Sequence, residues 1–119
     1  MAKFLDEIEG QFLSDENFQL TSDLVYESDI AKRTINVPAG FVTDFASFKL
    51  GMMRISIARE AAVVHDYCYR TKGFISKRLA DLVFLEAMKV TGIGWWRRTI
   101  LYEAVRWFGR FSYKGGVKK

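Results

Sequence analysis

The chain has 119 residues, of which 50% are hydrophobic and 15% aromatic, with nine glycines and one proline. This composition predicts one compact globular domain and excludes long disordered tracts. The formal net charge of +4 is mild, and the single cysteine excludes an internal disulfide, which fits a reducing compartment. No apolar run reaches the roughly 18 residues of a membrane span, and the N-terminus lacks the basic-then-apolar order of a secretory signal. We therefore expect no transmembrane segment and no secretion signal.

The first half of the chain is predicted to be β-rich, over residues 14–50. The residues before it alternate poorly and predict a short helix or an arm. Short β-prone runs separated by turn-forming segments then follow, at 18–20, 24–26 and 34–37. We expect them to form a small antiparallel meander. The turn signal Ala39-Gly40 begins a constrained loop, which we expect to hold Thr43 and Asp44 near the core.

The second half is predicted to be helical, over residues 55–113. Apolar residues recur at helical spacing in three segments divided by glycine-containing breaks, about 57–69, 77–90 and 95–111. Ser76 is a suitable N-cap for the second segment. The last residues, 114–119, are predicted to form a loose basic tail. The predicted architecture is α+β, with a small N-terminal antiparallel β meander followed by three α-helices in one domain, 1–119.

A polar cluster lies in the first predicted helix, within residues 61–70, which contain the only histidine and the only cysteine of the chain. The four-residue spacing of a helix puts His65 and Tyr69 on one face and Asp66 on the neighbouring face. A short loop makes the first two helices antiparallel neighbours, so Asp81 can face His65. A carboxylate bonded to one imidazole nitrogen orients the ring as a general base, and Tyr69 can donate to that carboxylate. Asp66 points elsewhere, where it can bind a cation together with loop oxygens.

These residues resemble the active-site signature of phospholipase A2, in which two antiparallel helices present a His-Asp pair, a tyrosine and a second aspartate. The prokaryotic branch, with a His-Asp-x-x-Tyr-Arg run and a later Asp-x-x-Phe, is the closer match. The resemblance implies a phospholipase-A2-like helix pair in which His65 activates water, Asp81 orients His65, Tyr69 supports them and Asp66 binds calcium. The glycine-rich, cysteine-flanked calcium loop of that enzyme is missing here, and Asp44 can supply a side-chain oxygen in its place.

A second resemblance covers nearly the whole chain and is carried by separated blocks in a fixed order, 37–47, 61–70, 78–88 and 102–106. In these blocks the chain is similar to a small phage- and prophage-encoded family, domain of unknown function 1353. That name supplies no activity. The resemblance implies a viral context and a set of polar positions, namely Thr43, Asp44, His65, Asp66, Tyr69, Arg70, Arg78 and Asp81.

Two functions follow from these observations. The first is a structural or accessory component of a phage virion or tail, or of its assembly, with other phage proteins as partners and the virion or host cytoplasm as its location. In that role the histidine network only locks the helices to the loop. The alternative is a metal-assisted hydrolase, in which His65 oriented by Asp81 deprotonates water and a divalent cation, calcium or zinc, on Asp66 and Asp44 stabilises the oxyanion. Its ester or amide substrate would come from a lipid, the cell wall or a nucleotide.

A nucleic-acid-binding module is the third hypothesis, and it depends on the basic third helix. Its tryptophans, Trp95, Trp96 and Trp107, lie at several angles round the helix, which favours core or partner-surface roles. We therefore do not expect a nucleic-acid partner. Cys68 lies three residues after His65, but its apolar surroundings favour a buried structural cysteine over a nucleophile.

Overall fold

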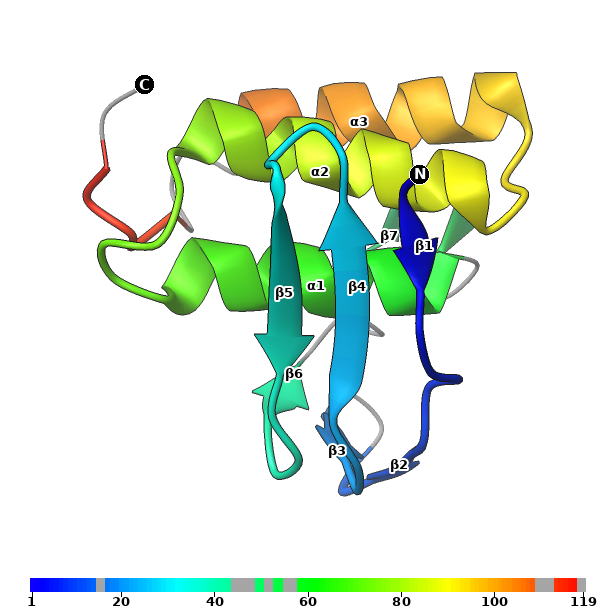
Figure 1. Cartoon of the computed structure of the whole chain (residues 1–119). Helices are drawn as coiled ribbons and strands as arrows, with labels where there is room; N and C mark the ends of the chain where they lie inside the picture. The colour runs from blue at the N-terminus through cyan, green and yellow to red at the C-terminus, as the bar shows by residue number, and fades with distance from the viewer. Residues whose placement is uncertain (15–16, 44–48, 51–52, 55–57, 109–112, 118–119) are drawn as a thin grey trace.

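The computed structural model separates strands and helices into two halves of the chain (Figure 1). It describes residues 1–14, 17–43, 49–50, 53–54, 58–108 and 113–117. Within these ranges eight short strands precede three helices. This order confirms the predicted α+β architecture.

The strands form three small antiparallel sheets. The first has the order β1-β4-β5 and consists of β1 (Lys3–Phe4), β4 (Leu24–Ser28) and β5 (Arg33–Val37). The second has the order β2-β3-β6 and consists of β2 (Gly10–Phe12), β3 (Phe18–Leu20) and β6 (Val42–Thr43). The third is the pair β7 (Lys49–Leu50) and β8 (Met53–Arg54).

The predicted meander, in which the three runs would pair in chain order, differs from the pairing in the structure. The three predicted strands exist as β3, β4 and β5, but β3 pairs with β2 and β6, while β4 pairs with β1 and β5. The segment predicted as a helix or an arm contributes β1 and β2. The reason lies in tertiary contacts, because Phe4 packs its ring 4.5 Å from that of Tyr26, a contact that local propensity does not encode.

The β4–β5 hairpin forms the base on which the helices pack. Its register runs from Leu24 opposite Val37 to Ser28 opposite Arg33, and alternate residues of β4 are buried as the period of a strand requires. Glu86 of the second helix accepts hydrogen bonds from Tyr26 Oη at 2.7 Å, from Ser28 Oγ at 2.8 Å and from the Ile30 backbone N–H at 3.0 Å. The hairpin is therefore tied to that helix by polar as well as apolar contacts.

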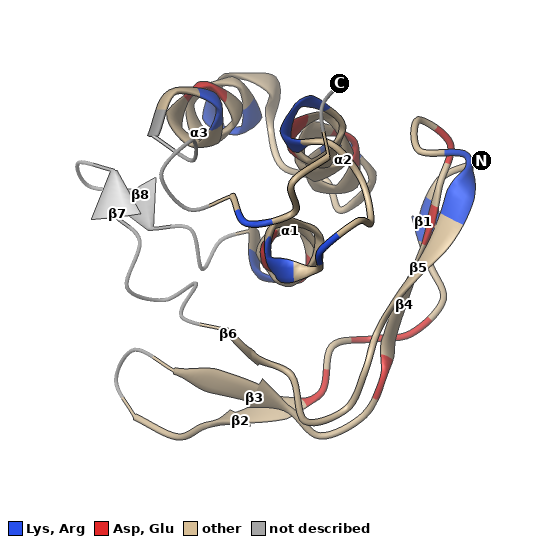
Figure 2. Ribbon diagram, turned by 90° about the vertical axis from the view of Figure 1, so that its left-hand side faces the viewer, with Lys and Arg blue, Asp and Glu red and all other residues tan. Residues whose placement is uncertain are grey.

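The three helices are α1 (Arg59–Arg70), α2 (Lys77–Val90) and α3 (Trp95–Phe108). The predicted N-cap is confirmed, since Ser76 Oγ accepts a hydrogen bond from the backbone N–H of Leu79 at 3.2 Å. Figure 2 views the helices nearly end-on and shows α1 and α2 facing β4 and β5. One apolar cluster joins the hairpin to all three helices, with Ile35, Val63, Phe84 and Leu101 among its fully buried members.

The C-terminal segment is packed in its described part, where we expected a loose tail. Lys114 donates its backbone N–H to the Tyr69 carbonyl at 2.8 Å, and Gly73 donates its own to the Gly115 carbonyl at 2.9 Å. Tyr113 Oη donates to the Ile75 carbonyl at 2.5 Å. Residues 113–117 therefore cover the end of α1 and the α1–α2 connection. Among the described helices, none has the length and apolarity to cross a membrane.

Candidate functional site: a buried carboxylate between two helices

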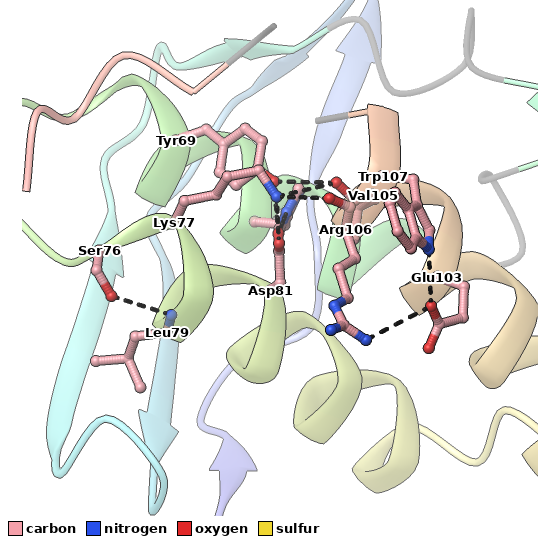
Figure 3. A network of polar contacts seen from close by, with 10 residues as sticks. Tyr69, Ser76, Lys77, Leu79, Asp81, Glu103, Val105, Arg106 and Trp107 are labelled. Atoms are coloured by element: carbon pink, nitrogen blue, oxygen red, sulfur yellow. Dashed lines mark hydrogen bonds and ion pairs between the residues drawn. The ribbon is translucent and has the colours of Figure 1, made fainter. Parts of the chain in front are cut away.

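Asp81 of α2 is the centre of a buried polar network (Figure 3). Only 2% of the residue is exposed, and its Oδ1 lies 2.9 Å from His65 Nε2. The Tyr69 hydroxyl donates to the same oxygen at 2.5 Å. Lys77 donates from Nζ to Oδ2 at 2.7 Å. The structure thus brings together His65, Tyr69 and Asp81, the three predicted catalytic residues, and adds a lysine.

Helix periodicity explains this convergence. His65 and Tyr69 are four residues apart on α1, and Lys77 and Asp81 are four apart on α2, so each helix directs one pair toward the other. The His65 ring lies between two aromatic neighbours, with centroids 4.0 Å from Tyr69 and 4.8 Å from Phe84. These rings fix the plane of the imidazole.

The electrostatics of the network keep Asp81 ionised. Burial raises the pKa of Asp81, but the hydrogen bonds from His65, Lys77 and Tyr69 outweigh that effect and hold the pKa below its usual value. Burial, and then the hydrogen bond to Asp81, raise the pKa of Tyr69, so its hydroxyl remains a donor. Because an ionised carboxylate has no proton to donate, the hydrogen in the His65–Asp81 contact belongs to Nε2. In the neutral imidazole, Nδ1 is then the basic nitrogen.

The environment of His65 Nδ1 differs from that of Nε2. In the described part of the chain, the hydrogen bonds of His65 involve Nε2 alone. Among the described residues, the fully enclosed side-chain polar atom that lacks a hydrogen-bond partner is Thr43 Oγ1. No hydrogen bond from a described residue reaches His65 Nδ1, and only 7% of His65 is exposed.

Lys77 is the functional residue that the sequence reasoning missed. Besides Asp81, its Nζ contacts the backbone carbonyls of Arg106 at 3.0 Å and Val105 at 3.4 Å, near the end of α3. Carbonyls at a helix C-terminus lack intrahelical partners, so a lysine there completes their hydrogen bonding. The available signal was its position four residues before Asp81, the spacing of a helical ion pair.

Asp66 and Arg70 form a second contact, outside the Asp81 network. The Arg70 guanidinium donates to Asp66 Oδ2 at 3.1 Å and to the carbonyl of Val42 in β6. It also lies 4.4 Å from the centre of the Phe41 ring. Arg70 therefore fastens β6 to α1, and the carboxylate of Asp66 faces a guanidinium.

The predicted cation site is represented here only by Asp66. Asp44, the second predicted ligand, lies outside the described residues. Within the described chain, no three histidine, cysteine or carboxylate side chains are grouped so as to hold a metal ion. A single carboxylate that faces an arginine does not by itself make a cation site. The calcium or zinc hypothesis therefore stays a prediction.

The remaining predicted residues do not bond to His65 or Asp81. Thr43 in β6 is 1% exposed, and its unpaired Oγ1 is described above. Arg78 is exposed on α2 and lines a cavity on the α3 side of Asp81. Cys68 is buried, and burial raises the pKa of its thiol to about 12 despite the opposing charge of Arg33. A thiol with this pKa is almost entirely protonated at neutral pH, as expected for a structural cysteine.

Comparison with known protein families gives one match. Residues 18–105 match a family model described as a protein of unknown function, DUF1353. The matched region runs from β3 into α3 and contains every side chain that bonds to Asp81. No match was found among curated proteins or among solved structures.

Proposed function

This chain belongs to the DUF1353 family, and we propose that its helix pair α1–α2 carries a hydrolytic site with His65 as the general base. The observation that supports this most directly is the 2.9 Å contact between His65 Nε2 and Asp81 Oδ1. A histidine held through one nitrogen by a buried carboxylate, with its other nitrogen free of hydrogen bonds to the described residues, has the arrangement that base catalysis requires. The resemblance to the phospholipase A2 signature supports the same reading.

The proposed reaction is the hydrolysis of an ester or amide from a lipid, the cell wall or a nucleotide. His65 Nδ1 removes a proton from water as the water oxygen bonds to the carbonyl carbon or phosphorus of the substrate. When the bond to the leaving group breaks, the imidazolium returns that proton to it. Asp81 stabilises the positive ring through Nε2, and Tyr69 keeps the carboxylate in position. No step here depends on a metal, because the described residues supply one of its two predicted ligands.

The test compares His65→Gln with the wild-type protein against phospholipids, peptidoglycan and nucleotide esters. Turnover is expected to fall at least about 100-fold in the variant, because a positioned general base contributes that much or more. Glu103→Gln, which changes a half-exposed carboxylate on α3, is the control and should retain turnover. Both variants should melt close to the wild type.

The assays are run with calcium, with zinc and with chelator, which also tests the predicted cation. Equal turnover by His65→Gln and the wild type on a hydrolysed substrate would exclude His65 as the base. Turnover by none of the proteins on any substrate would count against a hydrolytic function.

A second candidate function is an accessory role in phage assembly, supported by an exposed ridge on α3. Trp96, Ile100 and Trp107 are 49%, 39% and 60% exposed, and their spacing places them along one side of the helix. Large apolar side chains in a row on a surface helix are typical of a protein contact. The family resemblance implies a viral context, so we propose that this ridge contacts another phage protein.

Phage that carry Trp107→Gln are expected to yield fewer infectious particles than wild-type phage. The reason is that the substitution removes an exposed aromatic anchor without disturbing the core. Trp95→Gln is the matched control, because Trp95 is 70% exposed at the start of α3 but lies off the ridge. Plaque counts together with the protein content of purified particles measure the effect. Equal yields for all three phage would contradict this role.

A further inference from the structure

A cavity of about 490 Å³ lies between α2 and α3, on the side of Asp81 away from α1. It is lined by Lys77, Arg78, Asp81, Leu82, Tyr102 and Arg106. Its volume is typical of sites for small organic molecules. We propose that this cavity binds an organic phosphate, meaning a phosphate group attached to an apolar substituent. This inference concerns binding alone and does not depend on hydrolysis by His65.

The charge of the lining favours an anion. Lys77 and Asp81 neutralise each other at 2.7 Å, so the two arginines leave the lining with a net charge of +2. Arg106 pairs with Glu103 at 3.8 Å, and both side chains are about half exposed, so this pair is weak and an incoming anion can compete for the arginine. In the part of the chain described, Arg78 makes no hydrogen bond or ion pair. Its five N–H donors are therefore available to a ligand.

The positions of the arginines suit a phosphate group. Arg78 and Leu82 are four residues apart on α2, and Tyr102 and Arg106 are four apart on α3, so each wall combines one cation with one apolar or aromatic surface. A guanidinium presents a planar fork of donors that matches phosphate oxygens in pairs. The Tyr102 hydroxyl adds a donor without a hydrogen-bond partner among the described residues. Leu82 and the Tyr102 ring provide contacts for the apolar substituent.

Asp81 connects this cavity to the buried network. Its Oδ2 meets Lys77, and both residues line the cavity, while its Oδ1 faces His65 and Tyr69. A phosphate near Lys77 therefore lies on the opposite side of the carboxylate from the imidazole. Substitution of His65 should leave binding unchanged, which separates this proposal from the hydrolytic one.

Isothermal titration calorimetry with phenyl phosphate on the full-length protein tests the proposal. We expect the wild type and His65→Gln to bind phenyl phosphate with equal affinity. The affinity of Arg78→Gln and of Arg106→Gln should be lower by a factor of roughly ten or more, since each variant loses a charged hydrogen-bonding partner. Arg97→Gln is the matched control, because Arg97 is an exposed arginine of α3 that stacks on Trp96, outside the cavity. Its affinity should equal that of the wild type.

A parallel measurement uses phosphatidylcholine vesicles that contain phosphatidic acid, at constant ionic strength. Binding to vesicles but not to phenyl phosphate, again weakened by Arg78→Gln, supports the site with a lipid headgroup as the source of the phosphate. Binding to phenyl phosphate supports a soluble phosphate ester. If neither probe binds, the cavity is not a phosphate site and the proposal is overturned. If Arg97→Gln loses as much affinity as Arg78→Gln, the binding is only unspecific charge attraction, which also overturns the proposal. Melting curves of each variant exclude misfolding as the cause.

Discussion

Asp81→Ala is expected to lower the free energy of unfolding by about 3–5 kcal/mol, the usual effect of removing one partner from a buried ionic contact. The substitution deprives His65, Tyr69 and Lys77 of one common acceptor. The side chain of Lys77 is only 23% exposed, so its charge would be left partly buried without a counterion. For a chain of this size, the melting temperature should fall by more than about 10 °C.

Urea denaturation of Asp81→Ala and of Glu103→Ala measures the difference. Glu103 also pairs with a cation and accepts a hydrogen bond from Trp107, but its side chain is 44% exposed. Its loss should therefore change the free energy by less than about 1 kcal/mol. Equal and small effects in the two variants would mean that water replaces the Asp81 carboxylate, and that the network does not hold the helices together.

The same variant should differ from the wild type in its response to acid. The pKa of Asp81 in the folded protein lies below the ordinary value of 3.8, because burial is outweighed by its three hydrogen bonds. The folded state therefore binds this proton less readily than the unfolded state, and the contribution of Asp81 is complete only above pH 3.8. As the pH falls through and below that value, the stability difference between wild type and Asp81→Ala should shrink. A constant difference across this range would contradict the lowered pKa.

Phe84→Ala is expected to destabilise the fold by about 3–5 kcal/mol, because it removes a large side chain from a close-packed core. Phe84 is 0% exposed, and its ring lies 4.8 Å from that of His65. The cavity left behind would open beside the imidazole. Phe84→Leu should cost less, since it removes fewer buried atoms.

Ile100→Ala provides the control for Phe84→Ala, because Ile100 is 39% exposed on α3 and outside the core cluster. Its effect should be within about 1 kcal/mol. Urea denaturation monitored by circular dichroism measures all three variants. A loss below about 1 kcal/mol for Phe84→Ala would show that neighbouring side chains collapse into the space, which is the main source of variation in such substitutions.

The helices were predictable because their signals are local. The bounds of α2 match the prediction, since Ser76 caps its start and Gly92, with a φ of 88°, follows its end. The short strands β1 and β2 were missed because two or three residues show no periodicity. They are defined by partners at a distance, as when Lys3 pairs with Glu27.

The candidate site was predictable only where it depends on the spacing of residues within α1 and α2. Helical spacing was sufficient to put His65 and Tyr69 on one face and to bring Asp81 opposite them. It was not sufficient for Lys77, whose bonds to the carbonyls of Val105 and Arg106 depend on how α3 packs against α2. Interactions within one helix or between sequential helices can be read from spacing, whereas those that need a third element cannot.

The covering of the α1–α2 pair by α3 and by residues 113–117 limits how well the helix pair can stand alone. Without these two segments, the Lys77 ammonium lacks the α3 carbonyls, and the carbonyl of Tyr69 lacks the N–H of Lys114. An isolated helix pair therefore leaves polar groups of its interior only partly paired, which costs free energy. A fragment that stops after α2 should accordingly be less stable than the contacts between its two helices alone would suggest.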